Sequence, residues 1–574
     1  MQLNGAEIVI ECLKEQGVDT VFGYPGGAIL NVYDELYKHR DEIRHILTSH
    51  EQGAAHAADG YARATGKVGV CLATSGPGAT NLVTGIATAY MDSIPIVAIT
   101  CNVGVPLLGK DSFQEIDIAG VTMPITKYSY IVKDVTKLAE TIRKAFRIAK
   151  TGRPGPVLID IPKDIQTAAG PAEYPSNIQI RGYKPNESVH IGQLKKAYKL
   201  LRTAKKPLIL AGGGINIAHA NDKLLALAEK MQIPVVTTIM GKGAIPTSHP
   251  LYVGNSGMHG KYAANMAVSK CDVLFSIGTR FNDRITGDLN EFAPKAKIVH
   301  IDVDTASISR NVVVDVPVVS DANLALEKLL EWAESKDTEQ WQKEIAEWDK
   351  KNPLEMRRDC GMTPQMVFEH VNRTFREAVY VTDVGQHQMW ATQYLELDSW
   401  HQLITSGGLG TMGFGFPAAI GAKIGNRDKE VVCFTGDGGF QMNIQEMATA
   451  VVQEAPVIIC LFNNYYLGMV RQMQQLFYGK RYEATCLRRR RTCPANCKGP
   501  NASCPPYTPD FIALAKSYGA HGIRVEKEED IQAALDEART YTDAPTIIEF
   551  MISTDEIVLP MVKSGNPMSE MILK

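Results

Sequence analysis

The chain alternates short apolar runs with segments in which apolar residues recur at helical spacing. In the clearest example, two apolar runs of strand length, at residues 431–434 and 457–462, flank an amphipathic segment at 444–454. A strand, helix, strand unit of this length makes its two strands parallel. Because the same alternation recurs along the chain, we predict an α/β fold built from doubly wound parallel sheets.

The alternation falls into three blocks. We predict domains at residues 1–171, 191–336 and 362–550, a cysteine-rich insert at 486–508 inside the third, and a C-terminal tail at 551–574. A chain of 574 residues is long enough for about three domains of ordinary size. Pro171, Pro175 and Pro185 indicate a linker after the first domain, and an acidic helical segment near 331–351 joins the second to the third.

Composition narrows the class of protein. With 45% hydrophobic and 21% charged residues the chain is typical of a soluble globular protein, and its net charge of −3 gives no sign of a nucleic-acid partner. The N-terminus enters an amphipathic helix directly, and no apolar run reaches membrane-spanning length. We therefore expect a cytoplasmic protein without membrane contact. Five of the eleven cysteines lie in apolar strand-like runs, which fits a reducing compartment: Cys71, Cys101, Cys271, Cys433 and Cys460.

Two polar residues end neighbouring parallel strands of the third block. Asp437 follows the first apolar run and Asn464 follows the second, so both should emerge at the carboxyl edge of one sheet, where open α/β sheets bind ligands. A carboxylate and an amide oxygen with open coordination positions suit Mg²⁺. Gly436 and Gly438 would let a diphosphate approach the backbone closely. The pattern predicts a magnesium-diphosphate site, the plainer alternative being a buried strand pair with polar turn residues.

The GDG and NN motifs at this spacing resemble the diphosphate signature of thiamine-diphosphate (ThDP) enzymes. The resemblance implies that Asp437, Asn464 and the Tyr466 carbonyl bind Mg²⁺. Glu51, in HEQGAAHAADGYAR, would ordinarily be a charge that offsets a helix dipole. In ThDP enzymes the matching glutamate binds the aminopyrimidine and activates the cofactor, which is the role we expect here.

A second cofactor is indicated in the middle block. Residues 207–216 form a strand that runs into Gly212, Gly213 and Gly214, a turn suited to a dinucleotide phosphate, and these residues alone leave FAD and NAD undecided. GMHG at 257–260, GTRFNDR at 278–284 and HIDVD at 300–304 resemble the FAD-binding segments of biosynthetic acetohydroxyacid synthase (acetolactate synthase) large subunits, although Asn282 stands where that family usually has aspartate. The flavin-binding residues implied are Arg153, Gly212, Gly213, Gly214, Gly257, Met258, His259, Gly260, Gly278, Arg280, Arg284, Asp302 and Asp321.

The same resemblance supplies the remaining site residues and the reaction. Further ThDP contacts are expected at Gln386, His387, Gly410, Met412, Gly436, Gly438 and Met469. Gly27, Phe113, Gln114, Lys163, Met469 and Met473 are expected to line the substrate pocket. The family decarboxylates pyruvate and adds the two-carbon unit to a second 2-ketoacid, pyruvate or 2-ketobutyrate, in the first common step of branched-chain amino-acid biosynthesis. Met473 replaces a tryptophan usual in the family, which leaves the choice of acceptor open.

The resemblance also implies a homodimer or homotetramer, since ThDP enzymes share each site between two subunits. It leaves open whether a small regulatory subunit binds. Two rival functions remain: another FAD-containing ThDP enzyme such as pyruvate oxidase, and a nicotinamide-dependent dehydrogenase supported only by the glycine turn and the strand-end aspartates. A non-catalytic nucleotide-binding module leaves Glu51, Asp437 and Asn464 without a purpose.

Two segments depart from the family. Cys486, Cys493, Cys497 and Cys504 form a C-x6-C-x3-C-x6-C pattern that matches neither a zinc ribbon nor a standard ferredoxin run. Four thiols this close together suggest a loop stapled by a metal or by disulfides. In the tail, Pro560, Met561 and Gly565 resemble a segment that closes over the cofactor, but VKSG replaces the usual VPAG.

Overall fold

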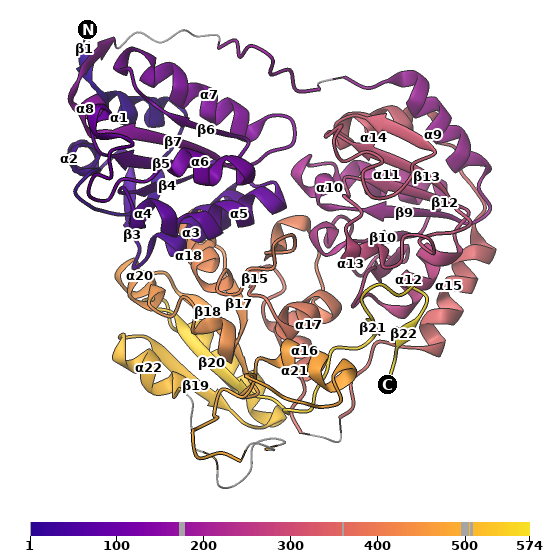
Figure 1. Cartoon of the computed structure of the whole chain (residues 1–574). Coiled ribbons are helices and arrows are strands. Elements are labelled where there is room, and N and C mark those ends of the chain that lie inside the picture. The colour runs from indigo at the N-terminus through magenta and orange to yellow at the C-terminus, as the bar shows by residue number, and fades with distance from the viewer. Residues whose placement is uncertain are drawn as a thin grey trace.

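The computed structural model of the chain describes residues 2–171, 178–186, 188–358, 361–494, 497, 504 and 509–574. Pro175 of the predicted linker and much of the cysteine-rich insert therefore lie outside the described residues. The described chain forms three six-stranded parallel sheets covered by helices (Figure 1), which confirms the predicted fold class.

The first sheet lies near the N-terminus and has the order β3-β2-β4-β5-β7-β6. Its strands are β2 (Thr20–Tyr24), β3 (Arg44–Leu47), β4 (Gly69–Ala73), β5 (Ile96–Asn102), β6 (Tyr128–Ile131) and β7 (Val157–Pro162). The helices of this part are α1 (Gly5–Glu15), α2 (Leu30–Lys38), α3 (Glu51–Thr65), α4 (Pro77–Asn81), α5 (Val83–Asp92), α6 (Ile118–Thr122), α7 (Leu138–Lys150) and α8 (Lys163–Thr167). A short antiparallel pair, β1 (Gln2–Asn4) with β8 (Ala169–Pro171), joins the two ends of this part.

The third sheet repeats the topology of the first, in the order β16-β15-β17-β18-β20-β19. Its strands are β15 (Val379–Thr382), β16 (Leu403–Thr405), β17 (Val431–Gly436), β18 (Val457–Asn463), β19 (His521–Val525) and β20 (Thr546–Met551). Its helices are α16 (Pro364–Thr374), α17 (Gln386–Tyr394), α18 (Gly415–Gly425), α19 (Asp437–Phe440), α20 (Glu446–Val452), α21 (Gly468–Phe477), α22 (Phe511–Ser517) and α23 (Ile531–Thr540). In both sheets the strand order reverses beside the first strand in sequence, the point at which such sheets bind ligands.

The middle sheet has a different order, β11-β10-β9-β12-β13-β14, which is that of dinucleotide-binding folds. Its strands are β9 (Pro207–Ala211), β10 (Val235–Thr237), β11 (Tyr252–Asn255), β12 (Val273–Ile277), β13 (Lys297–Asp302) and β14 (Val316–Val319). The helices around it are α9 (Ile191–Thr203), α10 (Gly213–Ile217), α11 (Asn221–Met231), α12 (Tyr262–Lys270), α13 (Asp283–Thr286), α14 (Ala322–Trp332) and α15 (Glu339–Lys351). The tail returns to this part through the antiparallel pair β21 (Met561–Val562) and β22 (Met571–Ile572) (Figure 1).

The first and third sheets are joined by the crossing of α3 and α18, and one hydrophobic core runs through both. The two helices touch backbone to backbone: a Cβ atom on Gly60 would lie 2.0 Å from the Ala418 carbonyl oxygen, and one on Gly421 would lie 1.9 Å from that of Ala57. Only glycine permits this approach. The close crossing therefore fixes the orientation of the first and third sheets relative to each other, and with it the positions of their carboxyl edges.

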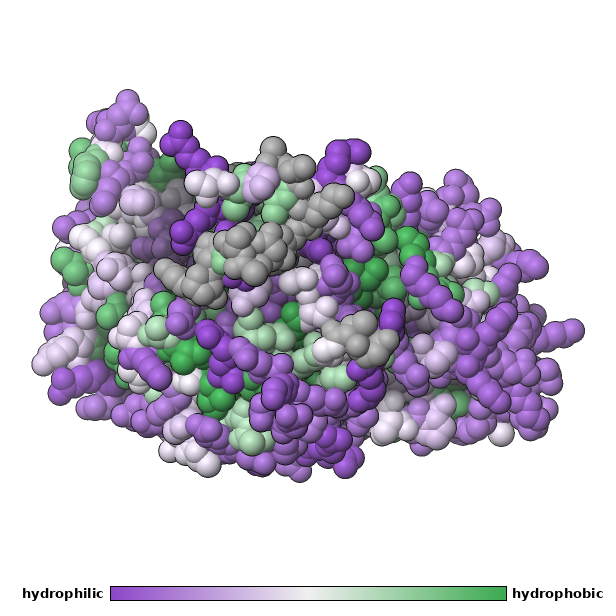
Figure 2. Space-filling model, turned by 90° about the horizontal axis from the view of Figure 1, so that it is seen from below, coloured by the Kyte–Doolittle hydropathy of each residue, from purple (hydrophilic) through white to green (hydrophobic). Residues whose placement is uncertain are grey.

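The predicted helix at 444–454 is shorter in the structure. It begins at Glu446 and ends at Val452, because residues 441–445 form turns in which the Asn443 side chain donates a hydrogen bond to the Gly413 carbonyl. None of the helices in the described part is long and apolar enough to cross a membrane. The face shown in Figure 2 is mainly hydrophilic, with hydrophobic residues in scattered groups.

Candidate cofactor and active site

Asp437 and Asn464 emerge side by side from the third sheet. β17 ends at Gly436, its parallel neighbour β18 ends at Asn463, and Asp437 begins α19. The Asp437 carboxyl group is buried; its Oδ1 accepts a hydrogen bond from the Gly438 amide at 3.0 Å, and no described residue hydrogen-bonds to its Oδ2. Asn464 is also buried, and its Oδ1 accepts from the Tyr466 amide at 3.0 Å. The structure thus brings the two predicted ligands to one edge of the sheet.

These residues fit a divalent cation. Burial raises the pKa of Asp437 to about 7, so an ionised carboxylate here is costly without a positive charge beside it. Within the described ranges no three His, Cys, Asp or Glu side chains form a metal cluster. A cation at Asp437 would therefore take neutral oxygens as its other protein ligands, and Mg²⁺ bound in this way usually completes its shell with phosphate oxygens and water.

Gln386 and His387, at the start of α17, lie against the same edge. The Gln386 side chain accepts a hydrogen bond from Asn464 Nδ2 at 3.3 Å and donates to Gln472 Oε1 at 3.0 Å. The His387 ring packs on the Gly436 backbone, where a Cβ atom would lie 3.0 Å from Nδ1. Burial lowers the pKa of His387 to about 3, so the imidazole is neutral. Its Nε2 has no partner among the described residues and remains open to a ligand.

Asp383 organises the loop that carries Gly410 and Met412, and sequence reasoning missed it. It is buried just after β15 and accepts hydrogen bonds from the amides of Gly413 and Gly415, at 3.0 and 2.9 Å. Burial raises the pKa of Asp383 to about 6 in spite of these amides. Asp383 directly follows a strand of the third sheet, as Asp437 does. A search for polar residues at strand ends, which identified Asp437, could therefore also have identified Asp383.

Glu51 is the first residue of α3 and lies at the carboxyl edge of the first sheet. Its side chain is buried, and Oε2 accepts a hydrogen bond from Asn81 Nδ2 at 2.9 Å. A Cβ atom on Gly78 would lie 3.0 Å from Glu51 Oε1, so the SGPG turn leaves this carboxylate room only because Gly78 lacks a side chain. Gln114 packs its backbone on Gly76 of the same turn, which brings a predicted substrate residue close to Glu51.

Glu446 links the third part of the chain to the first, and the sequence analysis did not predict it. It begins α20 in the third part of the chain, is fully buried, and accepts a hydrogen bond from the Ser49 amide at 3.2 Å. A Cβ atom on Gly53 would lie 2.3 Å from Glu446 Oε1, an atom with no partner in the described part. A second buried carboxyl group therefore lies beneath the helix turn that carries Glu51, and burial raises the pKa of Glu446.

The residues predicted to line the substrate pocket lie on two surfaces. Gly27, Phe113, Gln114 and Lys163 are exposed at the edge of the first sheet, and Phe113 is 86% exposed. Met469 and Met473 are half-buried on α21 of the third part. The two groups therefore belong to different parts of the chain.

A large cavity opens at the carboxyl edge of the middle sheet, where the strand order reverses between β9 and β12. Its volume is about 660 Å³, and its walls come from all three parts of the chain, including Asp92 and Ser93 of the first and His401 and Gly407 of the third. Eight of the predicted flavin residues line it: Arg153, Gly213, Gly214, Gly278, Arg280, Arg284, Asp302 and Asp321. Its size is that of a site that encloses a large cofactor.

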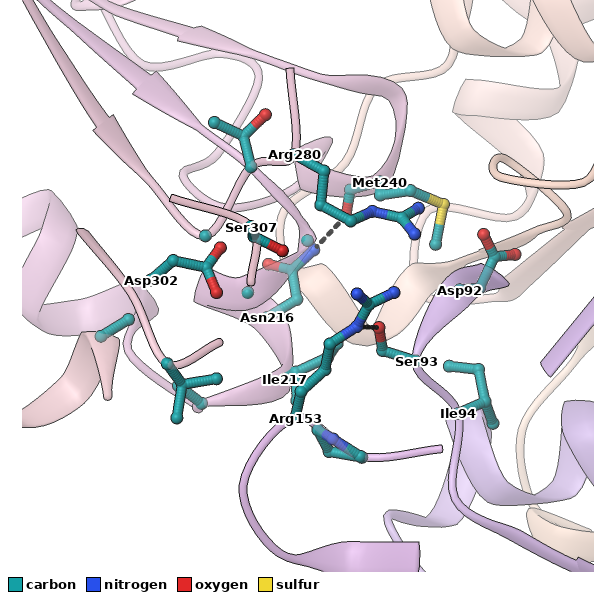
Figure 3. A pocket seen from close by; sticks show the side chains of 18 of the residues that line it. Asp92, Ser93, Ile94, Arg153, Asn216, Ile217, Met240, Arg280, Asp302 and Ser307 are labelled. Carbon is teal, nitrogen blue, oxygen red and sulfur yellow. Dashed lines mark hydrogen bonds between the residues drawn. The ribbon is translucent and has the colours of Figure 1, made fainter. Parts of the chain in front are cut away.

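Two arginines give this cavity a positive wall (Figure 3). Arg153 donates to Ser93 Oγ at 2.8 Å and forms an ion pair with Asp304 at 3.2 Å. Arg280 faces Arg153 across the cavity. The pKa of Arg280 is lowered, mainly by burial and to a smaller extent by the positive charge of Arg153. A pair of guanidinium groups beside the glycine turn at 213–214 suits a diphosphate.

The other five predicted flavin residues do not line the cavity. Gly212 packs on Gly278, where a Cβ atom would lie 2.1 Å from the carbonyl oxygen. In the GMHG segment, the Met258 amide donates a hydrogen bond to the Arg284 carbonyl, and the Met258 carbonyl accepts one from the Val562 amide of the tail, each at 2.8 Å. Neither the 257–260 segment nor Gly212 lines the cavity. Their position supports the loop at 284, and direct contact with a flavin stays a prediction.

Comparison with known proteins agrees with this architecture. Three domain families match in chain order: the thiamine pyrophosphate enzyme N-terminal TPP binding domain at residues 3–121, the central domain at 194–329 and the C-terminal TPP binding domain at 383–550. The fold and these matches define a three-domain thiamine pyrophosphate enzyme.

Relatives along nearly the whole chain are more specific. The chain is 47% identical to the probable acetolactate synthase large subunit of Methanococcus aeolicus, over 99% of this chain and 95% of the relative. It is 46% identical to the acetolactate synthase large subunit of Corynebacterium glutamicum, over 99% and 90%. It is 44% identical to that of Haemophilus influenzae, over 100% and 98%. The chain belongs to the acetolactate synthase large-subunit family, which confirms the resemblance inferred from its motifs.

Proposed function

We propose that this protein catalyses acetolactate synthesis: it decarboxylates pyruvate and joins the two-carbon unit to a second 2-ketoacid. The observation that carries the proposal is the 44–47% identity, along nearly the whole chain, to proteins named acetolactate synthase large subunits. The buried carboxyl groups of Glu51 and Asp437 support it, because each lies at the carboxyl edge of a parallel sheet, where such sheets bind ligands.

The diphosphate end of ThDP would be held through Mg²⁺ by Asp437, Asn464 and the Tyr466 carbonyl. Gln386 and His387 would contact the diphosphate from the start of α17. The unpaired Oδ2 of Asp437 and the unpaired Nε2 of His387 support this assignment, because both are buried polar atoms with no protein partner in the described part. When bound, ThDP supplies the carbanion chemistry that lets a 2-ketoacid lose carbon dioxide.

Glu51 would hold and move the proton at the aminopyrimidine ring. Its Asn81 hydrogen bond fixes the orientation of the carboxylate, and Gly78 leaves one oxygen accessible. Gly410 and Met412, on the loop held by Asp383, would contact the same ring from the other side. Gln114, Lys163 and Phe113 would orient the substrates and exclude water.

The cavity at the middle sheet would hold FAD. Arg153 and Arg280 would bind its diphosphate, and Asp302 at the end of β13 would accept ribose hydroxyl groups. Asp321 caps α14 through the Asn323 amide at 2.9 Å, so we assign it a supporting role at the rim of the cavity.

The working assembly would be a homodimer. Phe113, Met123 and Leu107 are exposed apolar side chains of the first part of the chain, and a second subunit would cover them and supply the facing half of the site. A small regulatory subunit is a further expected partner, because the relatives are named large subunits. The cytoplasmic location stays a prediction.

The test is a pyruvate-to-acetolactate assay on purified protein with and without ThDP, Mg²⁺ and FAD. We expect activity to require ThDP and Mg²⁺. Rapid anaerobic reduction of bound flavin by pyruvate, without acetolactate, would favour the pyruvate oxidase alternative. A parallel assay with added 2-ketobutyrate measures the acceptor preference that Met473 leaves open.

A further inference from the structure

Four cysteines from the insert surround one small cavity beside the proposed diphosphate site. Cys486, Cys493, Cys497 and Cys504 all line a space of about 20 Å³, together with Tyr466 and Arg488. A cavity needs about 10–15 Å³ to hold one water molecule, so this one has room for a single small ion. These cysteines are separated by up to 18 residues in sequence, and their convergence is a property of the fold.

We propose that these four cysteines bind a single thiolate-coordinated metal ion of the zinc class, and that this centre braces the loop at residues 465–467. Zn²⁺ takes four thiolates tetrahedrally at about 2.3 Å. On binding, each thiol releases its proton to solvent, and four Zn–S bonds form without any change in oxidation state. In the described part of the chain no three His, Cys, Asp or Glu side chains form a group that could hold a metal, so binding requires these four cysteines, which already line the cavity, to move closer together.

The charges around the cavity suit such a centre. Four thiolates and one Zn²⁺ carry a net charge of −2, and Arg488 and Arg489 both line the cavity. The Nε of Arg488 is buried and has no hydrogen-bond partner among the described residues, so a buried donor lies open to an anionic acceptor. The Arg490 amide donates to Cys493 Sγ at 3.3 Å, an arrangement that stabilises a thiolate.

The insert is hydrogen-bonded directly to the segment that carries the proposed Mg²⁺ ligands. The Leu467 amide donates to the Thr485 carbonyl, and the Leu487 amide to the Tyr465 carbonyl, each at 2.9 Å. Tyr465 has φ of 63°, a left-handed conformation that costs energy in a non-glycine residue, and the Arg488 guanidinium lies 4.3 Å from its ring centre. The insert therefore holds the chain in the conformation that aims Asn464 and Tyr466.

This bracing role rests on the proposed function, whereas metal binding by the cysteines does not. Without the metal, the insert loses its cross-links and the strained conformation at Tyr465 is less well supported. We expect the affinity for ThDP with Mg²⁺ to fall about tenfold, the lower end of the effect seen when a group that orients metal ligands is removed.

The first test is metal analysis of the full-length protein, expressed with both zinc and iron in the medium and purified without chelator. We expect about one zinc per chain. Iron with acid-labile sulfide would overturn the single-ion assignment. Protein with neither metal, or with the four sulfurs paired as disulfides by mass spectrometry, would overturn the proposal altogether.

The second test compares the double variant Cys493→Ser/Cys497→Ser with the control Thr492→Ser, which keeps all four thiols. Zinc should be lost only from the double variant, while bound flavin, measured by absorbance, stays equal in both and reports an intact fold. Zinc retained by the double variant would refute the site. ThDP affinity, measured by tryptophan fluorescence in the presence of Mg²⁺, should fall only in the double variant; equal affinities would refute the bracing role.

Discussion

Glu51 and Asp437 are both buried carboxylic acids that begin a helix, yet their surroundings differ. Glu51 has an amide partner in Asn81, whereas one oxygen of Asp437 has no partner in the described part of the chain. The first arrangement would orient the proton-transfer group that we propose, and the second would leave a lone pair for the proposed cation. The two residues therefore lead to different predictions.

Replacing Glu51 with glutamine removes the ionisable carboxyl group that we propose transfers the proton, while keeping the size of the side chain. We expect Glu51→Gln to lower kcat for acetolactate formation by about 10²–10⁴-fold, the usual contribution of a positioned acid or base. Steady-state assays check this. The exposed Glu377→Gln serves as control, and a Glu51→Gln enzyme with near-normal kcat would contradict the assignment.

Asp437 should make cation binding depend on pH. Because burial raises its pKa to about 7 from about 3.8, the native apoprotein keeps this proton where the unfolded chain has lost it. Its contribution to stability therefore falls as pH rises from about 4 to 7, and Mg²⁺ must displace the proton over that range.

We expect the Kd for Mg²⁺ with ThDP to fall about tenfold per pH unit between pH 5 and 7 and then to level off. Isothermal titration calorimetry at several pH values measures it. Asp437→Asn should bind weakly with no such slope, and the exposed Asp428→Asn should behave as wild type. The same slope in Asp437→Asn would assign the proton to another group.

At the scale of elements, the apolar pattern predicts the parallel sheets well, because strands buried on both faces are almost continuously apolar. It predicts helix ends less well, as α20 shows, since a helix ends where side chains find better partners elsewhere. The crossing of α3 and α18 is the element contact on which the site depends most, and it is set by glycines rather than by apolar side chains.

Gly421→Ala should therefore destabilise the protein. Its new methyl group would lie 1.9 Å from the Ala57 carbonyl oxygen, so the helices must separate, and we expect a loss of about 1–3 kcal/mol. Urea unfolding measures it. Gly192→Ala, near the exposed start of α9, should be neutral or slightly stabilising because alanine favours the helix. Equal stability of the two variants would show that the crossing adjusts freely.

At the scale of the whole molecule, the cavity at the middle sheet exists only because three parts of the chain meet there. Arg153 comes from the first part and pairs with Asp304 of the second, so it both lines the cavity and joins its walls. The glycine turn after β9 could be located from sequence. The walls from Asp92 and Gly407 could not, since nothing in the local sequence relates these positions.

Arg153→Ala should weaken FAD binding by about 10–100-fold, the value of a hydrogen bond to a charged group. Flavin fluorescence during dialysis measures the loss, and the exposed Arg147→Ala controls for removal of a surface arginine. Adding FAD should raise the melting temperature of wild type more than that of Arg153→Ala. Unchanged flavin retention would place the cofactor elsewhere.

The α/β class, the family and the meeting of Asp437 and Asn464 at one sheet edge could all be read from the sequence, because strand periodicity, motifs and strand-end polar residues are local signals. Asp383 and Glu446 escaped it, and the contact it predicts between the GMHG segment and a flavin stays a prediction. Three relations needed the tertiary structure: Glu446 lies under the Glu51 helix, the GMHG segment does not line the cavity, and the four cysteines of the insert share one small cavity. Those relations depend on how close separate elements approach, and that distance is set by packing across the whole chain.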